Sequence, residues 1–153
     1  MLGPGDRAPK LDLVSGDGRR QPLEELWSGA AVVLAVFKIS CPVCQLTLPI
    51  LERISGGALR FVAVSQDNAA SSSSFALKFR ITFPVLLDPA AGGYPVSNAL
   101  GVSSVPSIFV IETDGIISKS FAGFSKADIE ELGRRANAEP FLAGENVPQW
   151  KAG

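Results

Sequence analysis

The stretch that carries both cysteines of the 153-residue chain is FKISCPVCQLTLP, residues 37–49. It follows the apolar run AAVVLAVF (30–37), which has the length of a strand and no polar alternation. Such a run is expected of a central strand that is buried on both faces of a sheet. Pro42 favours the first turn of a helix, and the apolar residues after it recur at helical spacing. The stretch therefore predicts a buried strand that leads directly into a helix over 42–54.

The rest of the chain alternates between strand and helix patterns. Further strands are predicted at 11–14 (as an edge strand), 59–65, 83–88, 107–113 and 115–123, the last two joined by the hairpin signal Asp114-Gly115. One further helix is predicted at 22–27, with Pro22 as its first residue. A second is predicted to start near Asp67 or Asn68 and to include the Ser-rich segment 71–74, and a third is predicted at 126–136. This order predicts an α/β fold with a central mixed β-sheet and helices on both faces.

Length and composition favour one domain over residues 1–153, with residues 139–153 as a C-terminal tail. Hydrophobic residues make up 46% of the chain and charged residues 19%, which is the composition of a globular protein. The net charge of −1 provides no basic surface for nucleic acid. No apolar run approaches the roughly 20 residues that span a bilayer. We therefore expect no nucleic-acid partner, no membrane span, and a monomer or weak dimer.

The start of the chain, MLGPGDRAPK, contains no apolar segment of signal-peptide length. The sequence as given thus predicts a cytoplasmic protein. A periplasmic or extracytoplasmic location is the alternative, if a signal peptide was removed. In the tail, Phe141, Leu142 and Trp150 need a surface to bury against. We expect them to dock on their own domain, and a contact with a partner is the alternative.

The chain contains no histidine, which excludes a Ser-His-Asp or Cys-His catalytic pair and any His-ligated metal. A structural zinc needs about four ligands, usually cysteine or histidine. Cys41 and Cys44 supply two. We therefore predict no metal and no cofactor.

Cys41 and Cys44 are predicted to be a redox couple. Cys41 follows the buried strand and precedes Pro42, which places it at the N-cap of the helix. There its sulfur faces unpaired backbone N–H groups, which stabilise a thiolate, the nucleophile of disulfide exchange. Cys44 lies one turn further, where it can attack a mixed disulfide formed at Cys41. A structural disulfide is disfavoured because so short a loop removes little chain entropy, and inert core thiols are disfavoured by the helix start.

Four segments resemble those of one protein family: GDRAPKLDL (5–13), VVLAVFKISCPVC (32–44), FPVLLDP (83–89) and GVSSVPSIFVIETDG (101–115). In this order and at these separations they resemble the thioredoxin-fold redoxins, the thiol-specific antioxidant and TlpA-like proteins. The resemblance runs from about Pro4 to Ala136. It implies a thioredoxin-like fold with an N-terminal strand extension.

The resemblance also implies an activity. The chain would be a thiol–disulfide oxidoreductase that exchanges electrons with protein thiols and disulfides through Cys41 and Cys44, and a separate reductant would recycle it. Pro106 would be a cis-proline whose loop, with Val105, lies beside the cysteine pair and binds the partner's chain. The dipeptide Pro42-Val43 would help to set the reduction potential.

The chain departs from the family at three positions. Ser40 stands where many TlpA-like proteins have tryptophan, Thr47 where they have a proton-transferring glutamate, and Ala35 where thioredoxin has a buried aspartate. The usual general base for Cys44 is therefore missing, and a hydroxyl is a poor replacement. Lys38 favours a thiolate if its ammonium group reaches the site. The alternative is that Lys38 extends into solvent from the strand end.

Two other functions stay open. In a thiol peroxidase, Cys41 would attack a hydroperoxide and the sulfenic acid would condense with Cys44. Peroxiredoxins carry Pro-x-x-x-Thr/Ser-x-x-Cys, but here the proline and threonine positions hold Leu34 and Lys38. The guanidinium that orients the peroxide would have to come from Arg60 or Arg80. The third function is a non-catalytic redox sensor or binding module.

Overall fold

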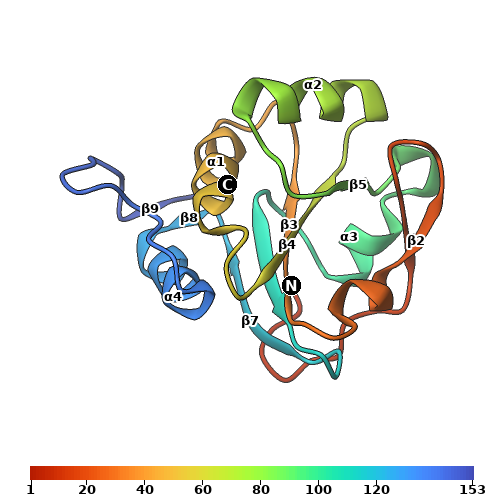
Figure 1. Cartoon of the computed structure of the whole chain (residues 1–153). Helices are drawn as coiled ribbons and strands as arrows, with labels where there is room; N and C mark the ends of the chain where they lie inside the picture. Colours follow the sequence, from red (N-terminus) through yellow and green to blue (C-terminus); the bar gives the residue numbers. More distant parts are fainter.

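This computed structural model describes residues 1–153, which build a seven-stranded mixed β-sheet (Figure 1). The strand order is β2-β1-β5-β4-β3-β6-β7. The strands are β1 (Asp12–Val14), β2 (Arg20–Pro22), β3 (Val32–Phe37), β4 (Arg60–Ser65), β5 (Val85–Leu87), β6 (Ser107–Ile111) and β7 (Ile117–Ala122). β3, β4 and β5 run parallel, whereas β1 and β6 are antiparallel to their neighbours. The predicted central mixed sheet is confirmed.

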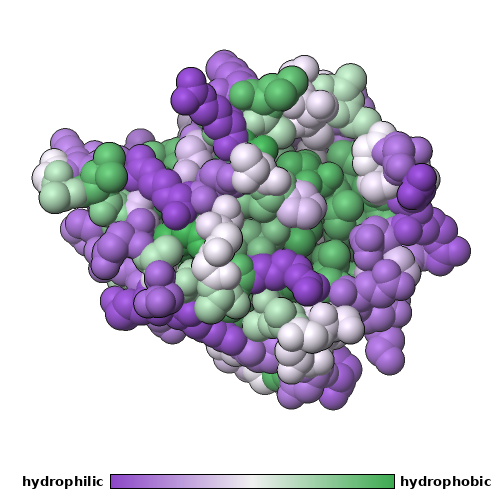
Figure 2. Space-filling model, in the orientation of Figure 1, coloured by the Kyte–Doolittle hydropathy of each residue, from purple (hydrophilic) through white to green (hydrophobic).

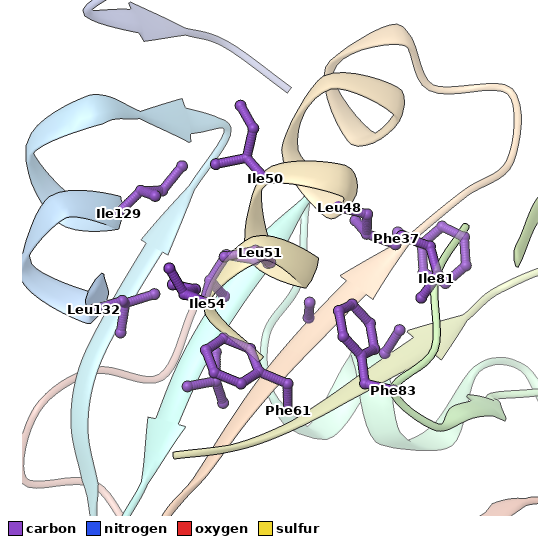
Figure 3. Close-up of a cluster of buried hydrophobic side chains, with 14 of the residues drawn as sticks. Phe37, Leu48, Ile50, Leu51, Ile54, Phe61, Ile81, Phe83, Ile129 and Leu132 are labelled. Carbon is purple, nitrogen blue, oxygen red and sulfur yellow. The ribbon is translucent and has the colours of Figure 1, made fainter. Parts of the chain in front are cut away.

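Helices cover both faces of the sheet, as predicted. They are α1 (Pro42–Ile54), α2 (Ala69–Phe79), α3 (Pro95–Ala99) and α4 (Lys126–Ala136), with 3-10 turns at Leu23–Trp27 and Ala90–Gly92. One core joins α1, α2 and α4 to the sheet, and the other joins α3 and the Leu23–Trp27 turn to the opposite face. Figure 3 shows the first core, where Leu51 and Ile54 of α1 meet Leu132 of α4.

The six side chains of β3 are divided between the two cores. Val33, Ala35 and Phe37 lie in the core under α1, and the other three lie in the opposite core. Every residue of β3 is buried. This is why its sequence is apolar without alternation, as expected of a strand covered on both faces.

Two predictions near the N-terminus are wrong. Residues 11–14 are not an edge strand, because β1 lies between β2 and β5 and the edge is β2. Pro22 is not the first residue of a helix, because its backbone is extended (ψ 129°) and it pairs with Asp12 as the last residue of β2. A strand of three residues that includes a proline carries almost no strand pattern, which is why β2 was not predicted.

The C-terminal tail docks only partly on the domain. Phe141 packs edge-on against Phe124 with ring centroids 6.2 Å apart, and Arg53 makes two hydrogen bonds of 2.7 and 2.9 Å to Glu145. Leu142 and Trp150 stay 67% and 62% exposed, and hydrophobic residues show at the surface of the protruding tail loop (Figure 2). The expectation that these side chains dock on the domain is correct for Phe141 and wrong for Leu142 and Trp150.

The tail returns to the domain through a second, two-stranded sheet that the sequence did not predict. It pairs β8 (Phe124–Ser125) with β9 (Trp150–Lys151) in antiparallel register. None of the helices combines the length and the apolar character needed to cross a membrane.

Candidate active site

Cys41 lies at the N-cap of α1, as predicted. Its backbone is extended (φ −84°, ψ 114°), and its N–H donates a 3.3 Å hydrogen bond to the carbonyl oxygen of Lys38, which closes a turn after β3. The Sγ atom of Cys41 accepts a 3.0 Å hydrogen bond from the N–H of Cys44. A donor aimed at the sulfur favours the charged thiolate over the neutral thiol. Cys41 as a whole residue is half-buried, in contrast to the core residues beneath it.

Cys44 lies one turn further along α1 and is fully buried in the core beneath the helix. Burial raises the pKa of the Cys44 thiol far above its ordinary value, and the hydrogen bond with Cys41 raises it further. At neutral pH Cys44 is therefore protonated. The two thiols sit in different environments, because one faces solvent at a helix start and the other faces apolar side chains.

The loop before β6 lies against the sulfur of Cys41. The Cys41 thiol donates a 3.4 Å hydrogen bond to the carbonyl oxygen of Val105, which is 64 residues away in the chain. The Val105–Pro106 peptide bond is cis, which confirms the expectation taken from the family resemblance. Pro106 is buried, and its carbonyl oxygen accepts a 2.8 Å hydrogen bond from the N–H of Gly123. The predicted neighbours Cys41, Val105 and Pro106 are thus brought together.

The other residues predicted to act on the site make contacts of different kinds. Pro42 is exposed in the first turn of α1. Thr47 is fully buried and donates a 2.7 Å hydrogen bond to the carbonyl oxygen of Val43, within its own helix. The Nζ of Lys38 lies 5.8 Å from the centroid of the Tyr94 ring, and no hydrogen bond or ion pair links it to either cysteine. Lys38 contacts the cysteine pair through its backbone.

Two residues that hold the active-site loop were not recognised in the sequence. Asp67 accepts a 2.8 Å hydrogen bond from the N–H of Ile39, across 28 residues, and Gln45 donates a 2.9 Å hydrogen bond to the carbonyl oxygen of Ile39. The loop between β3 and Cys41 is therefore fixed from both sides. A signal for Asp67 was present, because it follows β4 at the same carboxyl edge of the sheet as Cys41.

Removing the Asp67 carboxylate is expected to slow the attack of Cys41 on disulfides. Without its acceptor the Ile39 N–H loses a partner, and the loop that positions the sulfur becomes looser. We expect Asp67→Ala to lower the second-order rate constant about ten-fold, the order expected of one hydrogen bond to a charged group. Stopped-flow kinetics with a chromogenic disulfide measures this rate constant.

Asp67→Asn is the matched variant for this test, because its side-chain oxygen can still accept the Ile39 N–H. We expect it to keep most of the wild-type rate. Equal losses in both variants would contradict a positioning role.

Neither candidate arginine of a peroxide site lies beside Cys41. Arg60 begins β4 opposite Val32, at the end of β3 away from Cys41, and donates a 2.6 Å hydrogen bond to the carbonyl oxygen of Leu26. The six residues of β3 place its start, near Arg60, about 20 Å from its end, near Cys41. Arg80 caps the C-terminal end of α2, whose start is at the cysteine edge of the sheet. The orienting guanidinium of a peroxidase is thus not supplied by either residue.

The sheet order, the Cys-x-x-Cys pair at the start of α1 and the cis-proline loop beside it are the features of thioredoxin-like thiol–disulfide oxidoreductases. Within that class the chain belongs to the Redoxin family, whose model matches residues 3–138.

Two curated relatives carry the same name. Thiol-disulfide oxidoreductase ResA of Geobacillus thermodenitrificans is 28% identical over 134 residues, which are 83% of this chain and 74% of the relative. ResA of Geobacillus kaustophilus is 27% identical over 133 residues, which are 82% of this chain and 74% of the relative.

Solved structures share the fold. A protein assigned as thiol:disulfide interchange protein DsbE from Chlorobium tepidum is 25% identical with a TM-score of 0.75, covering 88% of this chain and 96% of that one. Peroxidoxin BcpB from Mycobacterium tuberculosis is 22% identical with a TM-score of 0.72, covering 89% of this chain and 96% of that one. The second likeness concerns the fold alone, so it does not favour a peroxidase.

Proposed function

We propose that the protein transfers electrons between its Cys41–Cys44 pair and the disulfides of other proteins. The observation that carries this proposal is the hydrogen bond from the Cys44 N–H to the sulfur of Cys41, which joins a half-buried cysteine at the helix start to a buried one a turn further on. This arrangement suits one sulfur to attack and the other to resolve. The names of the ResA relatives support the same chemistry.

In the first step the Cys41 thiolate attacks one sulfur of a substrate disulfide. A bond forms between Cys41 Sγ and that sulfur, the substrate S–S bond breaks, and the other substrate sulfur leaves as a thiolate that takes up a proton. The N–H of Cys44 stabilises the attacking thiolate. Val105 and Pro106 would bind the partner's chain beside the reacting sulfur, with the Val105 carbonyl oxygen 3.4 Å from Cys41 Sγ.

In the second step Cys44 loses its proton and attacks Cys41 Sγ. The Cys41–Cys44 disulfide forms, the substrate leaves as a second thiolate, and two electrons have passed to the substrate. A separate dithiol must then reduce the pair before the next cycle. The Thr47 hydroxyl is neutral and only weakly basic, so it is a poor proton acceptor for Cys44. We expect this second step to be the slower one at neutral pH.

The rate of the second step is expected to rise with pH. Only the Cys44 thiolate attacks, and burial raises the pKa of Cys44, so the reactive fraction grows about ten-fold per pH unit through the neutral range. The measurement loads Cys41 with a coloured aromatic thiol as a mixed disulfide and follows its release from about pH 6 to about pH 9. A plateau below about pH 8 would show that another group removes the proton efficiently.

Disulfide exchange and peroxide reduction are separated by one experiment. The reduced protein is mixed with hydrogen peroxide or with an oxidised protein disulfide, and thiol loss is followed in both. We expect rapid loss with the disulfide, and with peroxide the rate of an ordinary free thiol. A rate with peroxide that is roughly thousands of times higher than that of a free thiol would identify a peroxidase instead, because thiolate character alone explains a much smaller increase.

The location of the protein bears on which partner recycles it. The cytoplasmic prediction gains no support from the relatives. An extracytoplasmic location fits a solved neighbour of the same fold, described as a secreted Mycobacterium tuberculosis disulfide oxidoreductase (21% identical, TM-score 0.66). We propose that the protein works outside the cytoplasm, and fractionation of native cells tests this. Recovery in the cytosolic fraction alone would contradict it.

A further inference from the structure

The last four residues of the structure, Trp150–Gly153, lie between β8 and the cis-proline loop; they are called the C-terminal segment below. Lys151 pairs with Phe124 in the two-stranded sheet. Beyond it the chain reaches Val105, where a Cβ atom added to Gly153 would come 2.8 Å from the Val105 carbonyl carbon. In Figure 1 the chain runs from β9 back to the body of the domain, where it ends.

Two glycines allow this close approach. Gly153 has no side chain to meet the Val105 carbonyl group. Gly123 has a positive φ of 76°, and a Cβ atom there would collide with the carbonyl oxygen of Lys151. The N–H of Gly123 donates to the carbonyl oxygen of Pro106, so the same glycine contacts both the loop and the segment. The segment therefore lies backbone to backbone against the loop.

The segment borders the active site at the loop before β6. Gly153 lines a hollow of about 380 Å³ together with Lys38 and residues 102–105. The Val105 carbonyl oxygen that contacts Cys41 is thus also covered by the segment. Cys41 itself remains half-buried, so a small molecule can still reach it.

The segment is held by few contacts. Trp150 is 62% exposed, and none of residues 150–153 belongs to either core or packs against one. A two-residue strand pairing with exposed side chains opens at a small cost in free energy. A substrate chain that binds along the backbone of Val105 can therefore displace the C-terminal segment.

We propose that the C-terminal segment determines substrate selectivity. Its Gly153 lies against the backbone of Val105 and Pro106. An extended substrate chain would lie along the same backbone, so a polypeptide disulfide must displace the segment whereas a small disulfide need not. This inference rests on the function proposed above, and in particular on the role given there to Val105 and Pro106.

Gly153→Val tests the inference, because the added side chain cannot fit against the Val105 carbonyl and must push the segment away. Gly16→Val is the matched control, since nothing lies within 4 Å of a Cβ atom at Gly16. Each reduced protein is reacted with 2-hydroxyethyl disulfide and with an extended peptide that carries a mixed disulfide to a fluorophore. We expect Gly153→Val to react about five-fold faster with the peptide, roughly the effect of one net hydrogen bond, and at the wild-type rate with the small disulfide.

A variant that ends at Gln149 should give the same increase, and its thermal midpoint should match the wild type because no core residue is removed. An unchanged or lower ratio of peptide to small-disulfide rates in Gly153→Val would overturn the inference alone. A wild-type protein that reacts with neither disulfide would overturn the proposed function and the inference together.

Discussion

Serine in place of Cys41 is expected to abolish disulfide exchange and to leave the fold intact. A hydroxyl at this position does not form the anion that attacks a disulfide, and Cys44 cannot replace it because it is buried and its pKa is raised. We expect turnover to fall by at least about 1,000-fold, as for the loss of other catalytic nucleophiles. The assay is the reduction of a protein disulfide with dithiothreitol as the final electron donor.

The helix should survive this change because serine is a favoured N-cap residue, and its oxygen can accept the Cys44 N–H as the sulfur does. Cys41→Ala is the matched variant, since it removes both the nucleophile and the cap. Both variants should lose activity equally, whereas only Cys41→Ala should lose stability, by about 1 kcal/mol. Full turnover in Cys41→Ser would overturn the assignment of the nucleophile.

Serine in place of Cys44 is expected to stop the reaction after its first half. Cys41 still attacks the substrate, but no second thiol is present to release it, so the mixed disulfide accumulates. Turnover should fall by about 100-fold or more while the first leaving thiol appears in a single burst. Intact-mass spectrometry of the mixture measures the adduct and identifies trapped partners in a cell extract.

Two variants control this experiment. Cys44→Ala avoids burying an unpaired hydroxyl and should trap the same adducts with a smaller loss of stability. The double variant Cys41→Ser with Cys44→Ser should trap none. Adducts on Cys44 in the single variant Cys41→Ser would reverse the proposed order of attack.

The elements that the sequence predicted well are those with strong local signals. β3 and α1 follow from a continuous apolar run and from Pro42, and α4 begins and ends at the predicted residues 126 and 136. α3 was missed because it has five residues and begins after Tyr94, a left-handed residue without a side-chain cap. The two residues of β9 carry no alternation that a sequence pattern could reveal.

The residues of the active site also differ in how far the sequence predicted their positions. Cys41 and Cys44 are neighbours along one helix, so their geometry followed from local rules. Val105 and Asp67 reach the cysteine loop across 64 and 28 residues, and such contacts depend on the order of strands in the sheet. The sequence indicated Val105 and Pro106 only through the family resemblance. Asp67 was interpreted as the start of a helix, although its position after a strand at the carboxyl edge was a signal for the site.

The burial of β3 on both faces of the sheet fixes the position of the cysteine that attacks the substrate. A shift of this strand by one residue would exchange Phe37 and Ala35 with Val36 and Leu34, which have other volumes, and would disrupt both cores at once. The strand therefore cannot slide along its own axis. Cys41 follows four residues after the end of this strand, so its sulfur keeps a fixed position beyond the carboxyl edge of the sheet, and an approaching disulfide must adjust its position to the protein.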